Sequence, residues 1–304
     1  MTSSGPDPAD QPFRSGFCAF VGRPNAGKST LTNALVGSKI VITSDKPQTT
    51  RRAVRGVLTR PDGQLVIVDT PGLHRPRTLL GQRLNDVVRA TLSEVDVIGF
   101  CLPANEKIGP GDRYIATELA ELTAPVVAIV TKTDLAPKAR VAEQLLAVSQ
   151  LGGFTEIVPV SAKAGDQVGL LADLLLGQLP EGPQLYPDDA ATDEEVEVRI
   201  AELIREAALA DVRDELPHSI AVTVEEMLPR EDSELVDIFA TVHLERSSQK
   251  PIVLGAGGSR IKRIGTEARA GIEELLQRRV NLKLHVSVMG EWQRDPKKLD
   301  RLGF

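Results

Sequence analysis

Cysteines, aromatic residues and long apolar runs are scarce in this sequence of 304 residues. Its two cysteines, Cys18 and Cys101, cannot form a disulfide framework, and both lie in apolar runs, so we expect buried thiols in a reducing cytoplasm. No stretch approaches the roughly 18 uninterrupted apolar residues of a membrane-spanning helix. The polar, acidic start lacks the basic and apolar parts of a secretory signal, and we expect residues 1–15 to form a loose tail. An aromatic fraction of 3% argues against a stacking platform for nucleic-acid bases.

Charge is abundant but unevenly distributed along the chain. The net charge of −6 alone argues against nucleic acid as a partner. Residues 181–235, however, hold 17 acidic and 4 basic residues, whereas residues 246–304 hold 13 basic and 6 acidic residues. A basic C-terminal part behind an acidic connector is typical of proteins that bind nucleic acid or a membrane surface. A solvated helix surface of mixed charge is the alternative for part of this pattern.

Residues 16–180 alternate between apolar runs and helical patterns. The strand candidates are FCAFVG, AVRGVL, QLVIVDT, VDVIGFCLP, PVVAIVTKT and EIVPVSA. Runs so rich in Val, Ile and Ala are typical of strands buried on both faces of a mainly parallel sheet. The turn at 61–63 predicts an antiparallel hairpin between the second and third strands. With helices expected at 28–37, 80–93, 110–122, 138–150 and 167–179, the pattern predicts an α/β doubly wound domain.

The rest of the chain predicts a second, smaller domain. Residues 181–193 are rich in Pro and Asp and are expected to be an acidic linker. Residues 194–304 then follow the order helix, strand, strand, helical segments near 251–279, a strand at NLKLHVSV and a short basic helix. This order predicts an α+β domain, and no internal repeat is visible.

A phosphate-binding loop is predicted after the first strand. The segment GRPNAGKS, Gly22 to Ser29, matches the pattern G-x-x-x-x-G-K-[ST] and lies between a predicted strand and a predicted helix. Its glycines let successive backbone N–H groups face an anion, and the helix adds its positive end. Lys28 is expected to reach the β- and γ-phosphates of a nucleotide, and Ser29 to bind Mg²⁺. The surrounding strand and helix argue against a chance match or a merely structural glycine turn.

Two further segments predict a switch that senses the γ-phosphate. The segment Asp69 to Gly72 ends the strand QLVIVDT, where a carboxylate can provide a second contact to Mg²⁺. Gly72 can present its N–H to the γ-phosphate and flip when that phosphate leaves. Between the two motifs lies PQTTRR, residues 47–52, which alone would be read as a polar loop. One of Thr49 or Thr50, with Thr50 as the predicted metal ligand, is expected to contact Mg²⁺ only in the triphosphate state.

Guanine is the predicted base. Lys132 and Asp134 follow the strand PVVAIVT, where GTP-binding proteins carry N-K-x-D. The Asp134 carboxylate can accept two hydrogen bonds from guanine, whereas adenine has no donors there. The stem of Lys132 is expected to pack on the base, and a backbone N–H of the segment SAK, 161–163, to meet guanine O6. Thr131 stands where Asn is usual, so we expect guanine selectivity to persist with weaker affinity.

Taken in order, the motifs carry a family resemblance. The series GRPNAGKS, PQTTR, DTPG, TKTD and SAK resembles the translation-factor-related GTPases. More narrowly, the chain from about residue 16 to its end resembles the Era family of bacterial ribosome-assembly GTPases. The features outside the nucleotide motifs that carry this resemblance are DELPHS (214–219), GAGGSRIKRIG (255–265) and the ending EWQRD…LDRLGF. The resemblance implies a P-loop GTPase domain followed by a type II KH domain.

That resemblance also implies partners and an RNA-binding loop. The family binds the 3′ end of small-subunit ribosomal RNA, assists assembly of that subunit, and associates with the cytoplasmic face of the membrane; we expect a cytoplasmic monomer. A KH module clamps single-stranded RNA with a G-x-x-G loop. The implied RNA-binding residues are Gly255, Ala256, Gly257, Gly258, Arg260, Lys262 and Arg263. The family usually has Lys at the position of Ala256, so we expect weaker, not lost, RNA binding.

Catalysis is expected to depend on position and positive charge. Many small GTPases place a water-orienting Gln just after the DTPG-type turn, but here Leu73 takes that place, so slow intrinsic turnover is expected. His74 beyond it can help, although a surface histidine is the simpler interpretation. In related GTPases an Asn at the position of Asn25 helps to bind K⁺ against the phosphates, where a cation stabilises transition-state charge. The predicted catalytic residues are Lys28, Asn25 and Gly72.

Two classes of function stay open at this stage. One is a GTPase whose nucleotide state gates RNA binding, and the other is an RNA-binding assembly protein with structural GTP or GDP and negligible turnover. An ATP-using enzyme is disfavoured by Asp134 and the SAK segment. The residues expected to contact the nucleotide are Gly22, Arg23, Pro24, Asn25, Ala26, Gly27, Lys28, Ser29, Thr30, Thr49, Thr50, Asp69, Thr70, Pro71, Gly72, Thr131, Lys132, Asp134, Ser161, Ala162 and Lys163.

Overall fold

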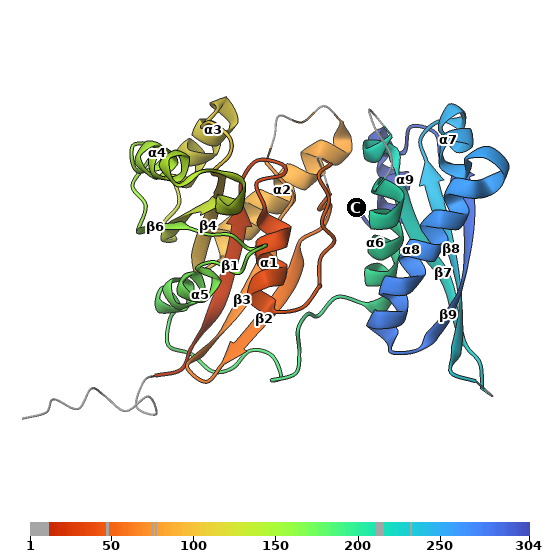
Figure 1. Cartoon of the computed structure of the whole chain (residues 1–304), viewed down its shortest axis with the longest axis horizontal. Helices are drawn as coiled ribbons and strands as arrows, with labels where there is room; N and C mark the ends of the chain where they lie inside the picture. The colour runs from red at the N-terminus through yellow and green to blue at the C-terminus, as the bar shows by residue number, and fades with distance from the viewer. Residues whose placement is uncertain (1–11, 47–48, 74–75, 77, 211–215, 232) are drawn as a thin grey trace, which may run out of the picture. The chain divides into compact units, whose positions relative to one another are not determined.

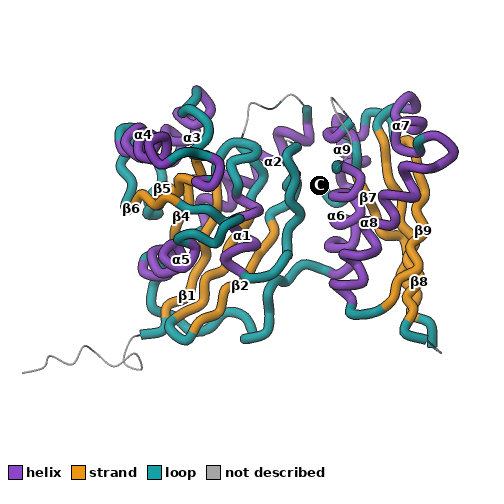
Figure 2. The backbone as a smooth tube through the Cα atoms, viewed as in Figure 1, coloured by secondary structure: helices purple, strands orange, loops and turns teal. Residues whose placement is uncertain are grey.

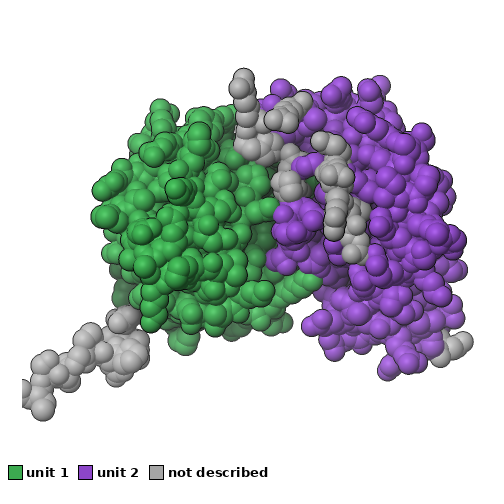
Figure 3. Space-filling view, turned by 45° about the horizontal axis from the view of Figure 1, so that its top comes forward, with its two compact units in different colours: residues 1–41, 50–74, 84–193 green, residues 42–49, 75–83, 194–304 purple. Residues whose placement is uncertain are grey.

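The chain divides into two compact units. The structure, a computed structural model, describes every residue except 1–11, 47–48, 74–75, 77, 211–215 and 232. Unit 1 comprises residues 1–41, 50–74 and 84–193, and unit 2 comprises residues 42–49, 75–83 and 194–304 (Figure 3). Most of the expected loose tail lies outside the described residues, and the first strand begins at Arg14.

Unit 1 is built on a six-stranded sheet with the order β2-β3-β1-β4-β5-β6 (Figures 1 and 2). Its strands are β1 (Arg14–Val21), β2 (Val54–Arg60), β3 (Gly63–Asp69), β4 (Val97–Pro103), β5 (Val126–Thr131) and β6 (Glu156–Pro159). Neighbouring strands are parallel except for β2 and β3, which form the predicted antiparallel hairpin. Because helices cover both faces, β3, β4 and β5 are buried along their whole lengths, as their apolar runs predicted.

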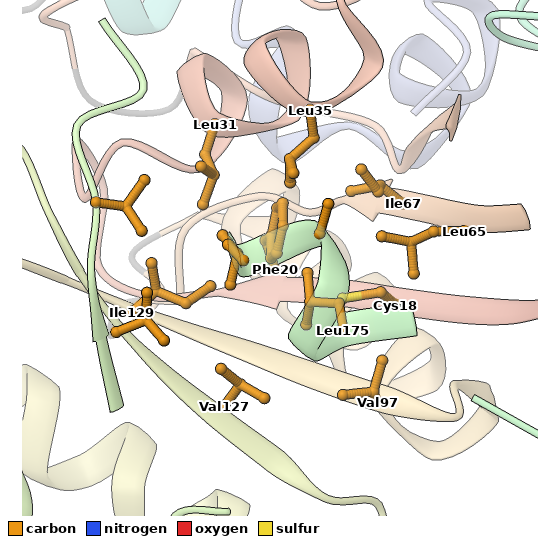
Figure 4. Packing of buried hydrophobic residues seen from close by; sticks show 14 of the residues in the cluster. Cys18, Phe20, Leu31, Leu35, Leu65, Ile67, Val97, Val127, Ile129 and Leu175 are labelled. Atoms are coloured by element: carbon orange, nitrogen blue, oxygen red, sulfur yellow. The ribbon is translucent and has the colours of Figure 1, made fainter. Parts of the chain in front are cut away.

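Helices pack on both faces of this sheet, so that alternate residues of β1 point into different cores. α1 (Lys28–Val36) and α5 (Val168–Gly177) cover one face, where Leu31 and Leu35 of α1 point toward Phe20 of β1 (Figure 4). α2 (Leu79–Glu94), α3 (Pro110–Leu119) and α4 (Lys138–Ser149) contribute to the core of the other face, together with Ala19 and Val21. The carboxyl ends of the parallel strands therefore meet at one edge, where all the nucleotide motifs begin.

Both cysteines are fully buried in unit 1, as expected. Cys18 belongs to β1 and Cys101 to β4. Burial raises the pKa of the Cys101 thiol to about 12, and it raises that of Cys18 as well. Neither thiol is therefore ionised near neutral pH.

The acidic connector, residues 181–193, lies along unit 1. The backbone N–H of Val57 in β2 donates to the carbonyl of Ala191 at 2.9 Å. Gln64 of β3 is completely buried; its side chain accepts the backbone N–H of Tyr186 at 2.8 Å and donates to the carbonyl of the same residue at 2.9 Å. A fully hydrogen-bonded amide in this position holds the connector against the β2–β3 hairpin.

The C-terminal part of unit 2 has the predicted order of elements. They are α6 (Val196–Leu209), β7 (Ala221–Pro229), β8 (Leu235–Leu244), α7 (Lys250–Leu254), α8 (Ser259–Leu276), β9 (Arg279–Val288) and α9 (Pro296–Arg301). The sheet order is β7-β8-β9, with β7 antiparallel and β9 parallel to the central strand. The helix expected at the start of this part ends at Leu209, and residues 211–215 are outside the described part.

One apolar core joins the two long helices of unit 2 to its sheet. Ile204 of α6 and Ile272 of α8 are fully buried in a cluster with Ile238 and Val242 of the central strand. Trp292, also fully buried, stacks on Phe304 with the ring centroids 5.7 Å apart. Within the described part of the chain, no helix is both long and apolar enough to cross a membrane.

Candidate functional site

The loop from Gly22 to Ser29 joins β1 to α1 and has the geometry of an anion site. α1 begins at Lys28 after Gly27, whose φ of +92° lies in the left-handed region, and no side chain caps the helix. The first backbone N–H groups of α1 are thus left for a ligand, and the helix dipole favours a negative charge there. A bond of 3.2 Å from the Ala26 N–H to the Arg23 carbonyl closes the turn, and Asn25 within it is also left-handed, with φ +63°.

Lys28 is an ammonium group buried at the floor of this loop. It is 6% exposed, and its Nζ donates to the carbonyls of Gly22 and Arg23, each at 3.3 Å. Burial lowers the pKa of Lys28, while the neighbouring Asp69 acts in the opposite direction. Two long bonds to neutral carbonyls do not compensate fully for the lost hydration of a cation. A phosphate group is a better partner, which supports the predicted role of this lysine.

Ser29, Thr50 and Asp69 come together as a cluster of oxygen donors. The Ser29 hydroxyl donates to Asp69 Oδ2 at 2.7 Å and lies 2.9 Å from the Thr50 hydroxyl, which itself donates to Asp69 Oδ2 at 3.2 Å. Asp69 is fully buried, and its Oδ1 has no hydrogen-bond partner among the described residues. Burial raises the pKa of Asp69, although Lys28 and the two hydroxyls oppose that shift.

This donor set fits Mg²⁺. The ion prefers hard oxygen ligands and is usually held by one or two carboxylates together with phosphate and water oxygens. A buried carboxylate with an unsatisfied oxygen is costly unless a cation or donor completes it. Ser29, Thr50 and Asp69, the three predicted metal ligands, are the residues that would hold the ion.

The other predicted nucleotide contacts near these motifs differ in the surroundings of their side chains. The hydroxyl of Thr49 donates to the Lys46 carbonyl at 2.7 Å, and that of Thr70 donates to the Phe20 carbonyl at 2.6 Å. Both side chains are therefore engaged by their own unit. Thr30 is exposed in the first turn of α1, whereas Pro71 is buried. Pro47 and Gln48 of the expected switch lie outside the described residues.

The turn after Asp69 is packed tightly against the phosphate loop. A Cβ at Gly72 would lie 2.7 Å from the backbone nitrogen of Pro24, so a glycine is needed there. Leu73 is 4% exposed and belongs to the same apolar core as Val88 of α2. A leucine side chain is apolar and is held in the core here, so it cannot orient a water molecule. His74 lies outside the described residues.

Thr131 ties the end of β5 to the phosphate loop. It is 4% exposed, and its hydroxyl donates to the Ala26 carbonyl at 2.6 Å. The strand end is thus joined to the phosphate loop by a side chain that is shorter than the usual Asn. Lys132, which follows, has a left-handed backbone with φ +57°, and its stem lies beside Gly27.

The predicted base-reading carboxylate is oriented by a serine. Ser161 is fully buried, and its hydroxyl donates to Asp134 Oδ1 at 2.7 Å. The same hydroxyl accepts the N–H of Ala164 at 3.1 Å, which places the SAK segment beside Asp134. Asp134 itself is exposed, as are the neighbouring Lys163 and, in part, Ala162. The geometry suits a carboxylate that receives a base from solvent.

In unit 2, the second glycine loop lies between α7 and α8. Gly255 has φ +73°, and a Cβ there would lie 2.9 Å from the backbone nitrogen of Arg260. Gly257 and Gly258 are also left-handed, with φ +57° and +79°. α8 begins after Gly258 without a side-chain cap, so its first N–H groups are left for a ligand.

An open groove of about 610 Å³ follows this loop, lined by Pro251, Ile252, Gly255, Ala256, Ser259, Arg260 and Arg263. Arg260 donates to the Ile252 carbonyl at 3.0 Å, and Arg263 lies 3.8 Å from Glu267. Ala256 and Gly257 are exposed at the loop tip. Lys262 is exposed on α8 but is not among the residues that line the groove.

Sequence reasoning missed two acidic residues beside the phosphate loop. The Arg23 guanidinium, expected to contact nucleotide, pairs with Asp112 of α3 at 2.7 Å and with Glu106 at 3.1 Å. No motif connects residues so far apart in sequence. The only local signal was the helix start at Pro110–Gly111, with an acid in the first turn.

Comparison with known proteins identifies a family for each of the two domains. Residues 17–132 match a family model described as "50S ribosome-binding GTPase", and residues 215–293 match one described as "KH domain". The fold and the two glycine loops therefore define a P-loop GTPase with a C-terminal KH domain.

Similar whole proteins narrow this class. "GTPase Era" of Streptomyces coelicolor is 64% identical over 100% of this chain and 99% of its own length, and that of a Nocardioides species is 63% identical over 99% and 98%. The chain belongs to the Era family of GTPases. A crystal structure of Era in complex with MgGDPNP and nucleotides 1506–1542 of 16S ribosomal RNA is 36% identical, with a TM-score of 0.92 over 96% of this chain and 99% of that one.

Proposed function

We propose that this protein hydrolyses GTP to GDP and phosphate, and that it binds the 3′ end of small-subunit ribosomal RNA and assists assembly of that subunit. The observation that carries the first part is the cluster of Ser29, Thr50 and Asp69 beside the buried ammonium of Lys28. The groove after Gly258 and the Era relative crystallised with 16S ribosomal RNA support the second part.

Hydrolysis is a phosphoryl transfer to water, in which the protein supplies position and charge. Lys28 exchanges its two carbonyl contacts for phosphate oxygens, and the first N–H groups of α1 share their negative charge. Asp69, Ser29 and Thr50 would hold Mg²⁺, which when bound polarises the phosphate oxygens. The N–H of Gly72 lies in a turn that only glycine can form so close to Pro24. Asp134, oriented by Ser161, selects guanine.

A potassium ion is proposed to assist this reaction. Asn25 is exposed at the apex of the phosphate loop in the left-handed conformation, and Leu73 is buried away from the site. A cation beside Asn25 would stabilise the charge that develops between the β- and γ-phosphates. We expect GTP turnover to be faster in K⁺ than in Na⁺ at equal ionic strength, and Asn25→Ala to remove the difference. Equal rates for the unaltered protein in both salts would contradict this proposal.

The test of the main proposal is GTP turnover with and without an RNA that carries the small-subunit 3′ end. We expect turnover in both conditions and a faster rate with the RNA, because the nucleotide state is proposed to gate RNA binding. An RNA of the same length with the 3′ sequence scrambled is the control. Absence of turnover in both conditions would favour the second class of function, an RNA-binding assembly protein with structural GTP.

We also propose that the protein is a cytoplasmic monomer that makes peripheral contact with the cytoplasmic face of the membrane. The excess of 13 basic over 6 acidic residues in 246–304 is the feature that favours an anionic surface. Co-sedimentation of the protein with vesicles of anionic lipid and with vesicles of neutral lipid tests the membrane contact. Equal recovery with both kinds of vesicle would contradict an electrostatic contact.

A further inference from the structure

Arg23 occupies the second position of the phosphate loop, yet its side chain is directed at α3. Its Nε donates to Asp112 Oδ1 at 2.7 Å, and one terminal nitrogen donates to Glu106 Oε2 at 3.1 Å. The Asp112 side chain is 1% exposed, and its second oxygen accepts the N–H of Gly109 at 2.8 Å. The carboxylate is therefore fixed at the start of α3, and Arg23 is its charged partner.

The start of α3 is shaped to receive this arginine. A Cβ at Gly111 would lie 2.9 Å from Cδ of Arg23, so the glycine provides the space in which the side chain lies. The burial of the two carboxylates also differs: the Glu106 side chain is 44% exposed, whereas Asp112 is buried. An exposed ion pair contributes little, but a buried carboxylate that loses its partner is strongly unfavourable. Asp112 is thus the contact that matters.

The backbone carbonyl of Arg23 accepts hydrogen bonds from two other residues of the phosphate loop. Its carbonyl accepts the Ala26 N–H at 3.2 Å, and this turn contains Asn25 in the left-handed conformation. The same carbonyl accepts a bond from Lys28 Nζ, which must be given up when the lysine turns to a phosphate. The ion pair with Asp112 involves the side chain of Arg23 and so takes no part in that exchange.

We propose that Arg23 is a positioning residue: through Asp112 it holds the apex of the phosphate loop in the geometry that phosphoryl transfer needs. This inference rests on the proposed GTP hydrolysis. The competing view is that Arg23 leaves its carboxylates and contacts the γ-phosphate as an internal arginine finger. Removal of the Asp112 charge distinguishes the two roles. If Arg23 positions the loop, this change removes its partner and lowers the rate; if Arg23 is an arginine finger, the change releases it toward the phosphate.

The test is steady-state GTP hydrolysis by the full chain and its variants Arg23→Met, Asp112→Asn and the double variant. We expect each single variant to lose roughly tenfold in kcat with little change in KM, since small misplacements of reacting groups are costly. The double variant should be no slower than either single one, because both remove the same tie. Arg23→Lys should recover part of the loss, and Glu106→Gln, at the exposed partner, is the matched control and should stay within about twofold.

A second variant covers the case in which Asp112→Asn disturbs the start of α3. Gly111→Ala suits a helix and leaves Asp112 in place, but its methyl group occupies the space of the Arg23 side chain. It should lower kcat as Arg23→Met does. Undiminished kcat in both Asp112→Asn and Gly111→Ala, or additive losses in the double variant, would overturn the positioning role. Absence of turnover in the unaltered chain would instead remove the proposed function and this inference together.

Discussion

The two glycine loops of this protein begin their helices in the same way and differ in everything around them. Gly27 precedes α1 with φ +92°, and Gly258 precedes α8 with φ +79°; no side chain caps either helix. In both loops the left-handed glycine turns the backbone so that the first N–H groups of the helix are left for a ligand. Each loop is thus suited to a phosphate group, one in a nucleotide and the other in a polynucleotide.

Their surroundings decide which phosphate each loop accepts. The first loop is enclosed by the buried side chains of Lys28, Asp69 and Thr131. The second lies at an open groove, with Ala256 and Gly257 exposed at its tip. An enclosed site can make desolvated, strong contacts with one small ligand, whereas an open one gains affinity from several exposed charges that salt screens. The same backbone conformation therefore occurs in one site with buried side chains around it and in one that is open to solvent.

The largest expected effect separates the two loops completely. Lys28→Ala removes a buried charge from the phosphate site, and GTP affinity should fall by about 100-fold or more. RNA affinity of the C-terminal domain should be unchanged in the absence of nucleotide. Titration with a fluorescent nucleotide measures the GTP affinity, and filter binding measures the RNA affinity. A parallel loss of RNA affinity in nucleotide-free protein would contradict the independence of the loops.

The second loop is tested by a charge at its tip. A Cβ at Gly257 meets nothing within 4 Å, and both Asn and Asp tolerate its left-handed backbone. Gly257→Asp should weaken RNA binding by roughly tenfold through repulsion of phosphate, and most strongly at low salt. Gly257→Asn, which has the same shape without the charge, is the matched control. Equal losses in the two variants would show that shape, not charge, governs the tip.

The contact between Thr131 and the first loop is tested by removing the Thr131 hydroxyl. Thr131→Val keeps the shape but removes the hydroxyl that donates to the Ala26 carbonyl, leaving a buried acceptor unsatisfied. GTP affinity should fall by about tenfold, which corresponds to about 1.4 kcal/mol. Thr131→Ser should retain most of the affinity. Normal affinity in the valine variant would mean that this tie does not shape the loop.

The smallest expected effect is a gain. Ala256→Lys restores the residue usual in the family at an exposed position of the second loop, where it can reach a phosphate. RNA affinity should rise a fewfold, and the slope of log affinity against log salt should steepen by about one. Ala256→Gln, of similar length without charge, is the control. An unchanged salt slope would indicate that the lysine makes no phosphate contact here.

The elements of both domains could be predicted from sequence because each signal was local. Continuous Val and Ile runs marked the buried strands, and glycine or proline marked their ends. Because these strands are parallel, the motif loops that follow them meet at one edge of the sheet. The candidate sites were predicted in the same way, since the phosphate loop, the DTPG turn and the G-x-x-G loop are each contained in a few residues.

What sequence did not show depends on contacts between distant residues. Thr49 and Thr50 are chemically alike, and only the fold brings the second one to Ser29 and Asp69. The pairing of Arg23 with Asp112 spans 89 positions. The connector was predicted from its Pro and Asp content, yet its attachment to Gln64 depends on a sheet that must form first. Side-chain pairs of this kind have no periodicity that a single sequence reveals.

The burial of Leu73 has a consequence for the rate of GTP hydrolysis. Because its side chain is packed in the core of unit 1, Leu73 itself brings no polar group to an attacking water. For a GTP-hydrolysing protein, we therefore expect slow intrinsic turnover. On that expectation, the lifetime of the GTP-bound form would depend on an ion or a partner that supplies the missing contribution. Replacing Leu73 with a polar residue would not simply raise the rate of GTP hydrolysis, because a polar side chain at this position must first leave an apolar interior.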